Sequence, residues 1–99
     1  MNHIKNEMLK YLINKRHMTV SLLRLDLTGL SDRDEIISHF NNELNMCQFI
    51  IDNIDNKQVL ENNPYFWQWI DDNIVFFDST DKDLSFLFTN FKKLIEGDL

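Results

Sequence analysis

Three side chains that can bind metal or move protons recur along one segment of the sequence. Glu35, His39 and Glu43 are spaced four residues apart, which places them on one face of a helix. Carboxylate and imidazole sets hold metal ions in helical bundles when neighbouring helices supply matching ligands. The sequence contains no Glu-x-x-His motif that would supply them. We therefore interpret the three residues as the polar flank of an amphipathic helix, and we expect no metal and no other cofactor.

Nucleophilic chemistry has little support in the sequence. The one cysteine, Cys47, has neither a glycine nor a basic residue beside it, and it occupies an apolar helical position. Such a position is typical of a buried, unreactive thiol. With two glycines in the chain, there is no glycine-rich loop that could bind phosphate groups. No local Ser-His-Asp or Cys-His pattern is present, so we expect a protein that is not an enzyme.

The segment richest in binding chemistry runs from Asn63 to Phe77 and reads NPYFWQWIDDNIVFF. It holds both tryptophans, the only proline and two adjacent aspartates. Trp and Tyr are enriched at binding hot spots, whereas an unpaired carboxylate has to stay in water or meet a cation. The segment is either a core helix with a solvated acidic end or an edge that binds a partner. Under the second interpretation, the candidate partner-binding residues are Tyr65, Trp67, Trp69, Asp71, Asp72, Asp78, Asp81 and Asp83.

The net charge of −6 is concentrated in one half of the chain. Residues 1–50 contain six acidic and six basic residues, whereas residues 51–99 contain ten acidic and four basic residues and nine of the twelve aromatics. An acidic field repels nucleic acid and anionic lipid, and it accelerates encounter with basic proteins. The composition therefore favours a basic protein as the partner and disfavours nucleic acid, unless the acidity serves solubility alone.

The first half of the chain predicts helices, with one ambiguous segment. Apolar residues at helical spacing predict a helix over 3–16. Residues 19–30 fit a helix that Thr19 caps and Gly29 ends, but alternating leucines and polar residues also fit a strand near 20–28. Residues 31–54 predict the clearest helix, with Ser31 as its cap and an apolar stripe spaced by three and four residues. This stripe consists of Ile36, Phe40, Leu44, Cys47, Ile51 and Ile54.

The aromatic segment predicts a helix that begins at Pro64. Proline has a fixed φ and no N–H, so it suits the first turn of a helix, and Asn63 before it suits the cap. The pattern indicates a helix over 64–73. Beyond it, residues 73–78 include β-branched and aromatic side chains, so this segment either continues the helix or forms a short strand.

Polar residues separate the aromatic segment from its neighbours. Residues 55–63 are rich in asparagine and predict a loop or a short helix. Residues 78–81 break the apolar pattern and offer a cap to a last helix over 82–96, which Gly97 would end as its C′ residue. Phe86 lies opposite the apolar stripe of that last helix, which makes it a candidate for contact with another molecule.

These elements predict an all-α fold, a compact bundle of four to five helices in a single domain over 1–99. Two glycines and one proline leave few means of making tight hairpin turns, which argues against a many-stranded sheet. The alternative is an α+β fold with short strands near 20–28 and 73–78. The N-terminus does not resemble a signal peptide, and no apolar run is long enough to cross a membrane, so we expect a cytoplasmic protein.

The function that we expect is that of a small acidic inhibitor, which occludes a basic site on a partner protein such as a nuclease. Immunity proteins, antitoxins and phage anti-defence proteins share this size, acidity and lack of catalytic groups, which is a likeness of class and not of motif. One alternative is a structural subunit that self-associates through Phe49 and Phe86. Another is a helical regulator that binds nucleic acid through the basic residues of the first helix. Those residues are Lys5, Lys10, Lys15 and Arg16.

Overall fold

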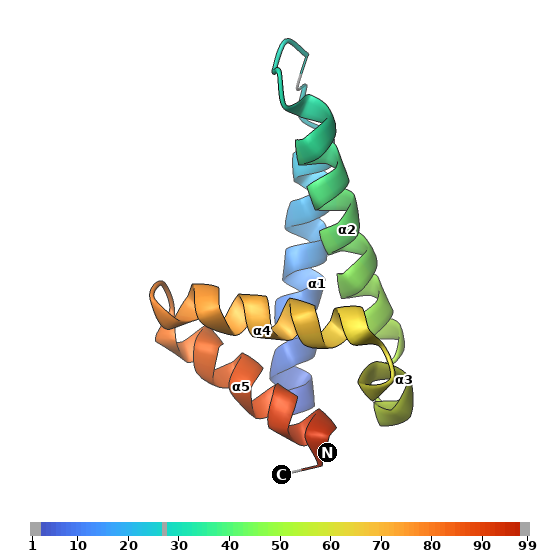
Figure 1. Cartoon of the computed structure of the whole chain (residues 1–99), viewed down its shortest axis with the longest axis vertical. Helices are drawn as coiled ribbons and strands as arrows, with labels where there is room; N and C mark the ends of the chain where they lie inside the picture. The colour runs from blue at the N-terminus through green and yellow to red at the C-terminus, as the bar shows by residue number, and fades with distance from the viewer. Residues whose placement is uncertain (1–2, 27, 98–99) are drawn as a thin grey trace.

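The computed structural model describes residues 3–26 and 28–97 of the chain. Within these residues the chain forms five helices and no strand (Figure 1). The helices are α1 (His3–Leu23), α2 (Arg33–Asp52), α3 (Lys57–Glu61), α4 (Pro64–Asp78) and α5 (Lys82–Glu96). The prediction of an all-α fold built from four to five helices is confirmed.

The two segments that could have formed strands adopt other structures, so the α+β alternative is wrong. Residues 73–78 continue α4. Of residues 20–28, the first four complete α1 and the next three begin a loop, while Leu27 lies outside the described residues. A strand without a neighbour leaves its backbone N–H and C=O groups unpaired, whereas a helix satisfies them locally.

The predicted break after residue 16 is wrong, because α1 continues to Leu23. Thr19, expected to cap a second helix, lies inside α1 and is buried. Its hydroxyl donates a hydrogen bond to the carbonyl oxygen of Lys15 at 2.8 Å, which satisfies the polar group without ending the helix. Gly29 has a positive φ of 92°, but it lies in the loop between α1 and α2 and not at a helix end.

The second helix, α2, begins two residues later than predicted. Ser31 does not cap it, because the N-cap position is Asp32, whose side chain makes no capping hydrogen bond. The predicted apolar stripe is buried only toward its C-terminal end, where Cys47 and Ile54 are buried. The other members of the stripe stay half-exposed, and they are Ile36, Phe40, Leu44 and Ile51.

The boundaries of the last two long helices follow local signals in the sequence. The side chain of Asn63 accepts hydrogen bonds from the backbone N–H groups of the two residues after Pro64, at 2.9 and 3.3 Å. Asp81 caps α5 by accepting a hydrogen bond from the backbone N–H three residues farther on, at 3.2 Å. Gly97 ends α5 with a φ of 89°, a left-handed conformation that glycine adopts without strain. The predicted cap at Asn63 and the predicted helix end at Gly97 are confirmed, and Asp81 is the residue of the predicted capping segment 78–81 that caps α5.

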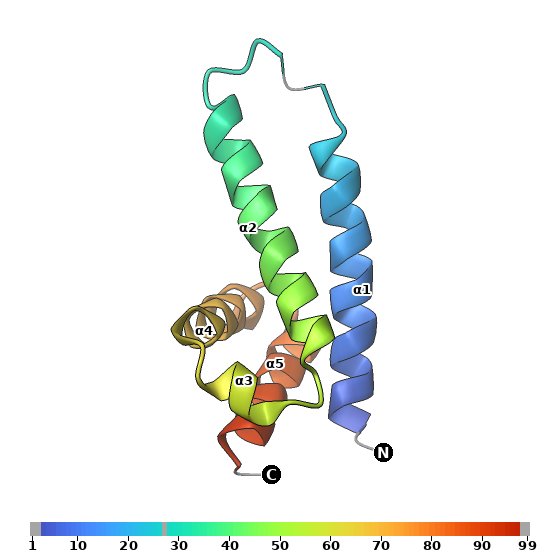
Figure 2. The same ribbon diagram turned by 90° about the vertical axis from the view of Figure 1, so that its right-hand side faces the viewer.

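The long helices form two antiparallel pairs that cross each other. The helices α1 and α2 run side by side along the longest axis of the molecule, and α4 and α5 form a second pair across its lower part (Figure 1). A view from the side shows α5 behind and between α4 and α1 (Figure 2), and α5 packs on both of them. The core lies where the two pairs meet. Its fully buried side chains include Met8, Ile50, Phe66, Phe88 and Phe91.

Only the lower part of the α1–α2 pair contributes to this core. The buried apolar residues of α1 end at Leu12, and the core residues of α2 begin at Met46. Beyond them the pair projects from the body of the molecule (Figure 2), and we call this part, residues 13–26 and 28–45, the arm. The molecule measures 48 × 28 × 23 Å and has a radius of gyration of 14.5 Å. A compact domain of this size has about 13 Å.

Candidate partner-binding site

The first turn of α4 determines which way its aromatic side chains point. Because Asn63 and Pro64 fix this turn, Tyr65 faces solvent and is 75% exposed, while Phe66 beside it is fully buried. Phe66 packs edge-on against Phe91 of α5, with ring centroids 6.0 Å apart. Among the three predicted aromatic anchors, Tyr65 is therefore the one that stands clear of the core.

Both tryptophans are held by hydrogen bonds within the chain. Trp67 is half-buried, and its indole N–H donates to the carbonyl oxygen of Glu61 at 2.8 Å. Trp69 is 9% exposed, and its indole N–H donates to Oε2 of Glu43 at 3.0 Å. The first bond fastens α3 to α4, and the second fastens α4 to α2. Most of each indole ring is therefore covered by the protein itself, so only a small part of either ring is exposed for contact with a partner.

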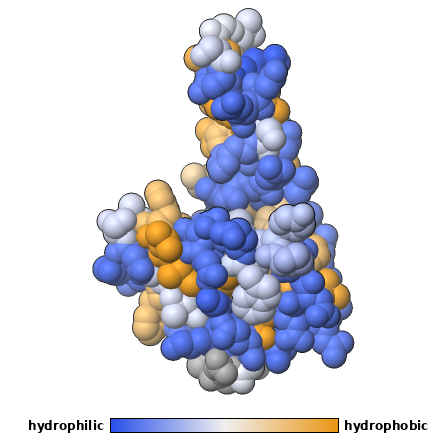
Figure 3. All heavy atoms as spheres, viewed as in Figure 1, coloured by the Kyte–Doolittle hydropathy of each residue, from blue (hydrophilic) through white to orange (hydrophobic). Residues whose placement is uncertain are grey.

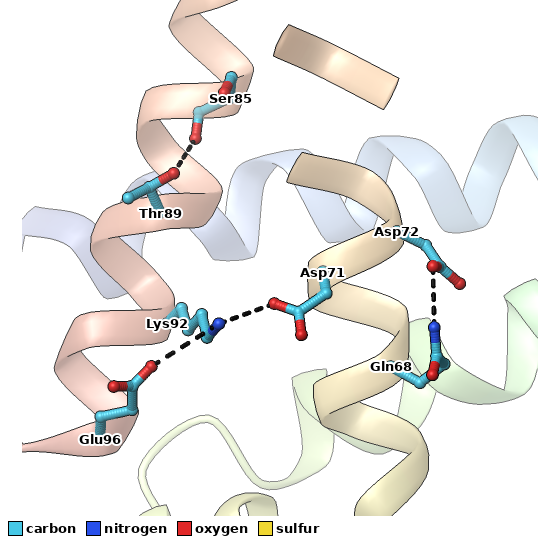
Figure 4. A network of polar contacts seen from close by, with 7 residues as sticks. All are labelled: Gln68, Asp71, Asp72, Ser85, Thr89, Lys92 and Glu96. Atoms are coloured by element: carbon cyan, nitrogen blue, oxygen red, sulfur yellow. Dashed lines mark hydrogen bonds and ion pairs between the residues drawn. The ribbon is translucent and has the colours of Figure 1, made fainter. Parts of the chain in front are cut away.

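The two adjacent aspartates of α4 point to different sides of the helix (Figure 4). Asp71 pairs with Lys92 of α5 at 2.8 Å, and Lys92 also lies 4.0 Å from Glu96. The hydrogen bond that Lys92 donates to Asp71 raises the pKa of the lysine. Asp72 accepts a hydrogen bond from Gln68 at 2.9 Å and pairs with no cation among the described residues. Its charge is therefore available to a cation from another molecule.

The remaining predicted acids, which we call the turn acids, lie where α4 leads into α5. Asp78 accepts a hydrogen bond from the hydroxyl of Ser85, and Asp81 caps α5. Asp83 is exposed in the first turn of α5, where a negative charge stabilises a helix N-terminus. These three carboxylates give the α4–α5 pair an acidic end, and each of them also stabilises that end.

A cleft of about 590 Å³ opens where the arm meets α4. Its lining includes Lys15 and Met18 of α1, His39 and Glu43 of α2, and Trp69, Asp72 and Phe76 of α4. Phe76 is 60% exposed. Apolar surface lies on both sides of this corner, over the outer end of α4 and along the adjacent edge of the arm (Figure 3). The cleft thus combines aromatic surface with two carboxylates and one amine.

Sequence reasoning missed Phe76 as a surface residue. Tyr65, Trp69, Asp72 and Phe76 recur at positions i, i+4, i+7 and i+11, which is the spacing of one helix face. This spacing is present in the sequence, but it places Phe76 on that face only if the helix continues beyond residue 73. The α1 residues of the cleft carry no such signal, because their position beside α4 depends on how the two helix pairs cross.

The residues considered for metal binding and for nucleophilic chemistry have other surroundings. Glu43 accepts the indole hydrogen bond described above, and the described part of the chain contains no group of three or more His, Cys, Asp or Glu that could hold a metal ion. Cys47 is fully buried, as predicted. Its burial, with a smaller effect of the nearby Glu43 carboxylate, raises the pKa of the thiol to about 11. At neutral pH the thiol is therefore protonated, and a protonated thiol is a poor nucleophile.

Comparison with known proteins does not assign the chain to a family. No protein-family model matches it, and neither the curated proteins nor the solved structures gave a significant match. Among the helices of the described residues, none is both long enough and apolar enough to cross a membrane. The function is therefore inferred from the surface of the molecule itself.

Proposed function

We propose that this protein is a small, non-catalytic inhibitor that occludes a basic site on a partner protein. The observation that supports the proposal is the outer face of α4, where Tyr65 and Phe76 are exposed on either side of Asp72. Aromatic side chains of this kind are enriched among binding hot spots. Asp72 forms no ion pair among the described residues. Its negative charge therefore favours a basic partner.

Occlusion needs an apolar anchor and a matched charge, and α4 carries both on one face. Tyr65 and Phe76 are eleven residues apart, about 16 Å along the helix. A lysine or arginine of the partner would meet Asp72, while neighbouring apolar groups of the partner would cover the two rings. The turn acids would extend the acidic field toward the approaching partner. That field raises the association rate, whereas the buried rings slow dissociation.

A nuclease, or another protein that binds nucleic acid, is the class of partner that fits this surface. Such proteins present Lys and Arg side chains where phosphate groups bind, and an acidic helix face competes for the same side chains. The mode of action would be that of an immunity protein, an antitoxin or a phage anti-defence protein, and the expected place of action is the cytoplasm.

A capture experiment with two matched variants tests the proposal. Asp72 and Asp52 each accept a hydrogen bond from the glutamine four residues earlier in their helix, but Asp52 lies on α2, outside the lining of the cleft. The wild type, Asp72→Lys and Asp52→Lys would be immobilised and exposed to an extract of the source cell at low and high salt. Mass spectrometry would identify the retained proteins, and circular dichroism would verify that the variants are folded.

We expect the wild type and Asp52→Lys to retain the same basic protein, and Asp72→Lys to retain about tenfold less of it. High salt should weaken retention, because it screens the charges. Equal retention by all three proteins would remove the outer face of α4 from the interface. Retention of nucleic acid without a protein would instead favour a regulator that binds it through α1.

A further inference from the structure

We propose that the cleft binds the guanidinium group of an arginine side chain, which stacks on the ring of Phe76 and pairs with the carboxylate of Asp72. The inference rests on the proposed function, because the arginine would belong to the basic partner. It extends that function by naming the side chain that the partner inserts and the place that receives it. Three features of the cleft lining support it, namely aromatic rings, available carboxylate oxygens and a net negative charge.

The cleft is formed by one face of each of three helices. Trp69, Asp72 and Phe76 of α4 line it at spacings of three and four residues. His39 and Glu43 of α2 are four residues apart, and the lining residues of α1 have similar spacings. Side chains at such spacings are neighbours on a helix surface. The volume, about 590 Å³, lies within the range of ligand sites, about 300 to 1,000 Å³, so the cleft can admit one long side chain of another molecule.

Aromatic rings line the cleft at its mouth and deeper in. Phe76 is exposed, whereas Trp69, seven residues earlier on the same helix, is almost completely buried. Tyr11 of α1 also lines the cleft and is half-buried. The negative face of an aromatic ring attracts a cation, and arginine makes this contact more often than lysine. Phe76 is therefore the ring that an entering guanidinium group meets first.

Two carboxylates of the lining are held in place and keep an oxygen for a further donor. Nε2 of Gln68 donates to Oδ1 of Asp72 at 2.9 Å (Figure 4). The indole N–H of Trp69 donates to Oε2 of Glu43 at 3.0 Å. Each bond occupies one of the two oxygens, and a carboxylate can accept from several donors at once. Asp72 lies four residues before Phe76, so one guanidinium group can reach both the carboxylate and the ring.

The lining has a net negative charge. It contains two carboxylates and one amine, that of Lys15, which leaves one negative charge when His39 is neutral. Lys15 takes part in no ion pair among the described residues. Its charge opposes the entry of another cation, so the charge of the cleft gives little affinity by itself. A cation that binds here must also gain from the aromatic surface.

Arginine fits these features better than lysine does. Its guanidinium group is planar and weakly hydrated, so it can stack on a ring while its N–H groups reach a carboxylate. The ammonium group of lysine is a compact and strongly hydrated point charge, which loses more hydration when it is placed beside Phe76. Proteins that bind nucleic acid carry arginine where phosphate groups bind. An arginine held in the cleft is withdrawn from that site.

An NMR titration of the isotope-labelled protein tests the proposal, with N-acetyl-arginine methylamide as the probe. The chain contains two tryptophans, and Trp69 lines the cleft whereas Trp67 does not. Each indole N–H gives its own resonance, which the variant Trp67→Phe assigns. We expect the Trp69 resonance to shift saturably, with a dissociation constant of about 1 mM, and the Trp67 resonance to stay in place.

Two further probes separate the effect of charge from that of shape. N-acetyl-citrulline methylamide has nearly the same shape as the arginine probe but no charge, and it should produce no saturable shift at the same concentrations. N-acetyl-lysine methylamide carries the charge without the planar group, and it should bind at least about threefold more weakly than the arginine probe.

Matched variants identify the carboxylate that holds the probe. Asp72→Asn can keep the hydrogen bond from Gln68 but loses the charge, so it should weaken binding of the arginine probe about fivefold or more. Asp52→Asn makes the same change at an aspartate that also accepts from the glutamine four residues earlier but lies outside the cleft lining. It should leave binding unchanged. Circular dichroism verifies that both variants are folded.

Two more substitutions test the ring and the amine of the cleft. Phe76→Leu keeps an apolar side chain and removes the ring, so it should weaken binding of the arginine probe about threefold. Lys15→Gln removes the like charge and should strengthen binding by about twofold to threefold.

The proposal is overturned if the Trp69 resonance does not shift, if the citrulline or lysine probe binds as tightly as the arginine probe, or if Asp72→Asn leaves binding unchanged. Retention of a basic protein in the capture experiment together with any of these results would keep the proposed function and remove arginine from the cleft. Saturable binding of the arginine probe without capture of a basic protein would instead overturn the proposed function and support the cleft as an arginine site.

Discussion

The two halves of the α1–α2 pair consist of the same helices in different surroundings. In the lower half, Met8, Leu12, Cys47 and Ile50 are fully buried, and α5 packs against α1 there. In the arm, residues of the same apolar stripe such as Phe40 remain half-exposed. The stripe is continuous across this boundary, so periodicity does not decide burial. Burial depends on whether a further helix packs against the α1–α2 pair. The two halves should therefore lose different amounts of stability when a phenylalanine or another apolar residue is replaced.

The largest expected difference concerns two phenylalanines. Phe88 is fully buried, and its ring centroid lies 5.2 Å from that of Tyr11 and from that of Trp69. Phe88→Ala should lower the free energy of unfolding by about 3 to 5 kcal/mol, whereas Phe40→Ala in the arm should lower it by about 1 kcal/mol. Urea denaturation followed by circular dichroism measures both losses. Equal losses at low protein concentration would contradict the contrast between core and arm.

A smaller expected effect is a pH dependence of the free energy of unfolding, which arises from the buried thiol of Cys47. Burial raises the pKa of Cys47 from 9.0 to about 11. A group whose pKa is raised in the folded protein stabilises it below the unfolded pKa, and this contribution is lost as the pH rises through the folded pKa. The free energy of unfolding should therefore fall by about 2 kcal/mol between about pH 8 and pH 11. Urea denaturation at a series of pH values measures the fall.

The variant Cys47→Ala isolates this contribution. Its free energy of unfolding should be lower at neutral pH, because a small cavity replaces the sulfur, but it should fall less steeply in alkali. Burial also raises the pKa of Tyr11, with smaller contributions from Glu43 and from Cys47 itself. The burial of Tyr11 acts in the same direction in both proteins, so the difference between the two slopes reports the thiol together with its effect on Tyr11. Parallel slopes would show that the thiol ionises as readily in the folded protein as in the unfolded chain.

The smallest effect compares two aspartates at helix N-termini. Asp81 accepts a capping hydrogen bond at the start of α5, whereas Asp32 holds the same position before α2 without one. Asp81→Ala should lower the free energy of unfolding by about 1 kcal/mol, and Asp32→Ala by less than about 0.5 kcal/mol, since only the favourable charge is lost. Thermal or urea unfolding measures both. A loss of stability at Asp32 as large as that at Asp81 would indicate that the side chain of Asp32 caps α2 in solution.

The sequence predicted those parts of the fold that depend on neighbouring residues. Asn63, Asp81 and Gly97 act through hydrogen bonds or backbone geometry within a few residues, so their effects are visible without tertiary structure. The same reasoning failed at Thr19, because a threonine is compatible with a cap and with a helix interior. Its hydroxyl bonds to the carbonyl one turn earlier, and nothing in the local pattern excludes that choice.

The candidate site was predictable only in part. Tyr65 and Asp72 follow from the pattern of α4, because both lie away from its buried face. The burial of Trp69 does not follow from that pattern, since it is linked to Glu43, 26 residues earlier in the chain. The cleft was not predictable either, because its α1 wall depends on the crossing of the two helix pairs. Contacts between distant segments leave no periodic signal along the chain.

The packing of α1 on α5 also bears on the order in which the molecule forms during synthesis. Each antiparallel pair consists of segments that are close in the sequence, so each can form soon after it leaves the ribosome. Tyr11 in α1, however, meets Phe88 in α5, and Phe88 is translated only near the end of the described chain. Until then, the apolar face of the first pair is exposed to other nascent chains and to chaperones. Of the five described helices, the one that is made last is the one that closes the core.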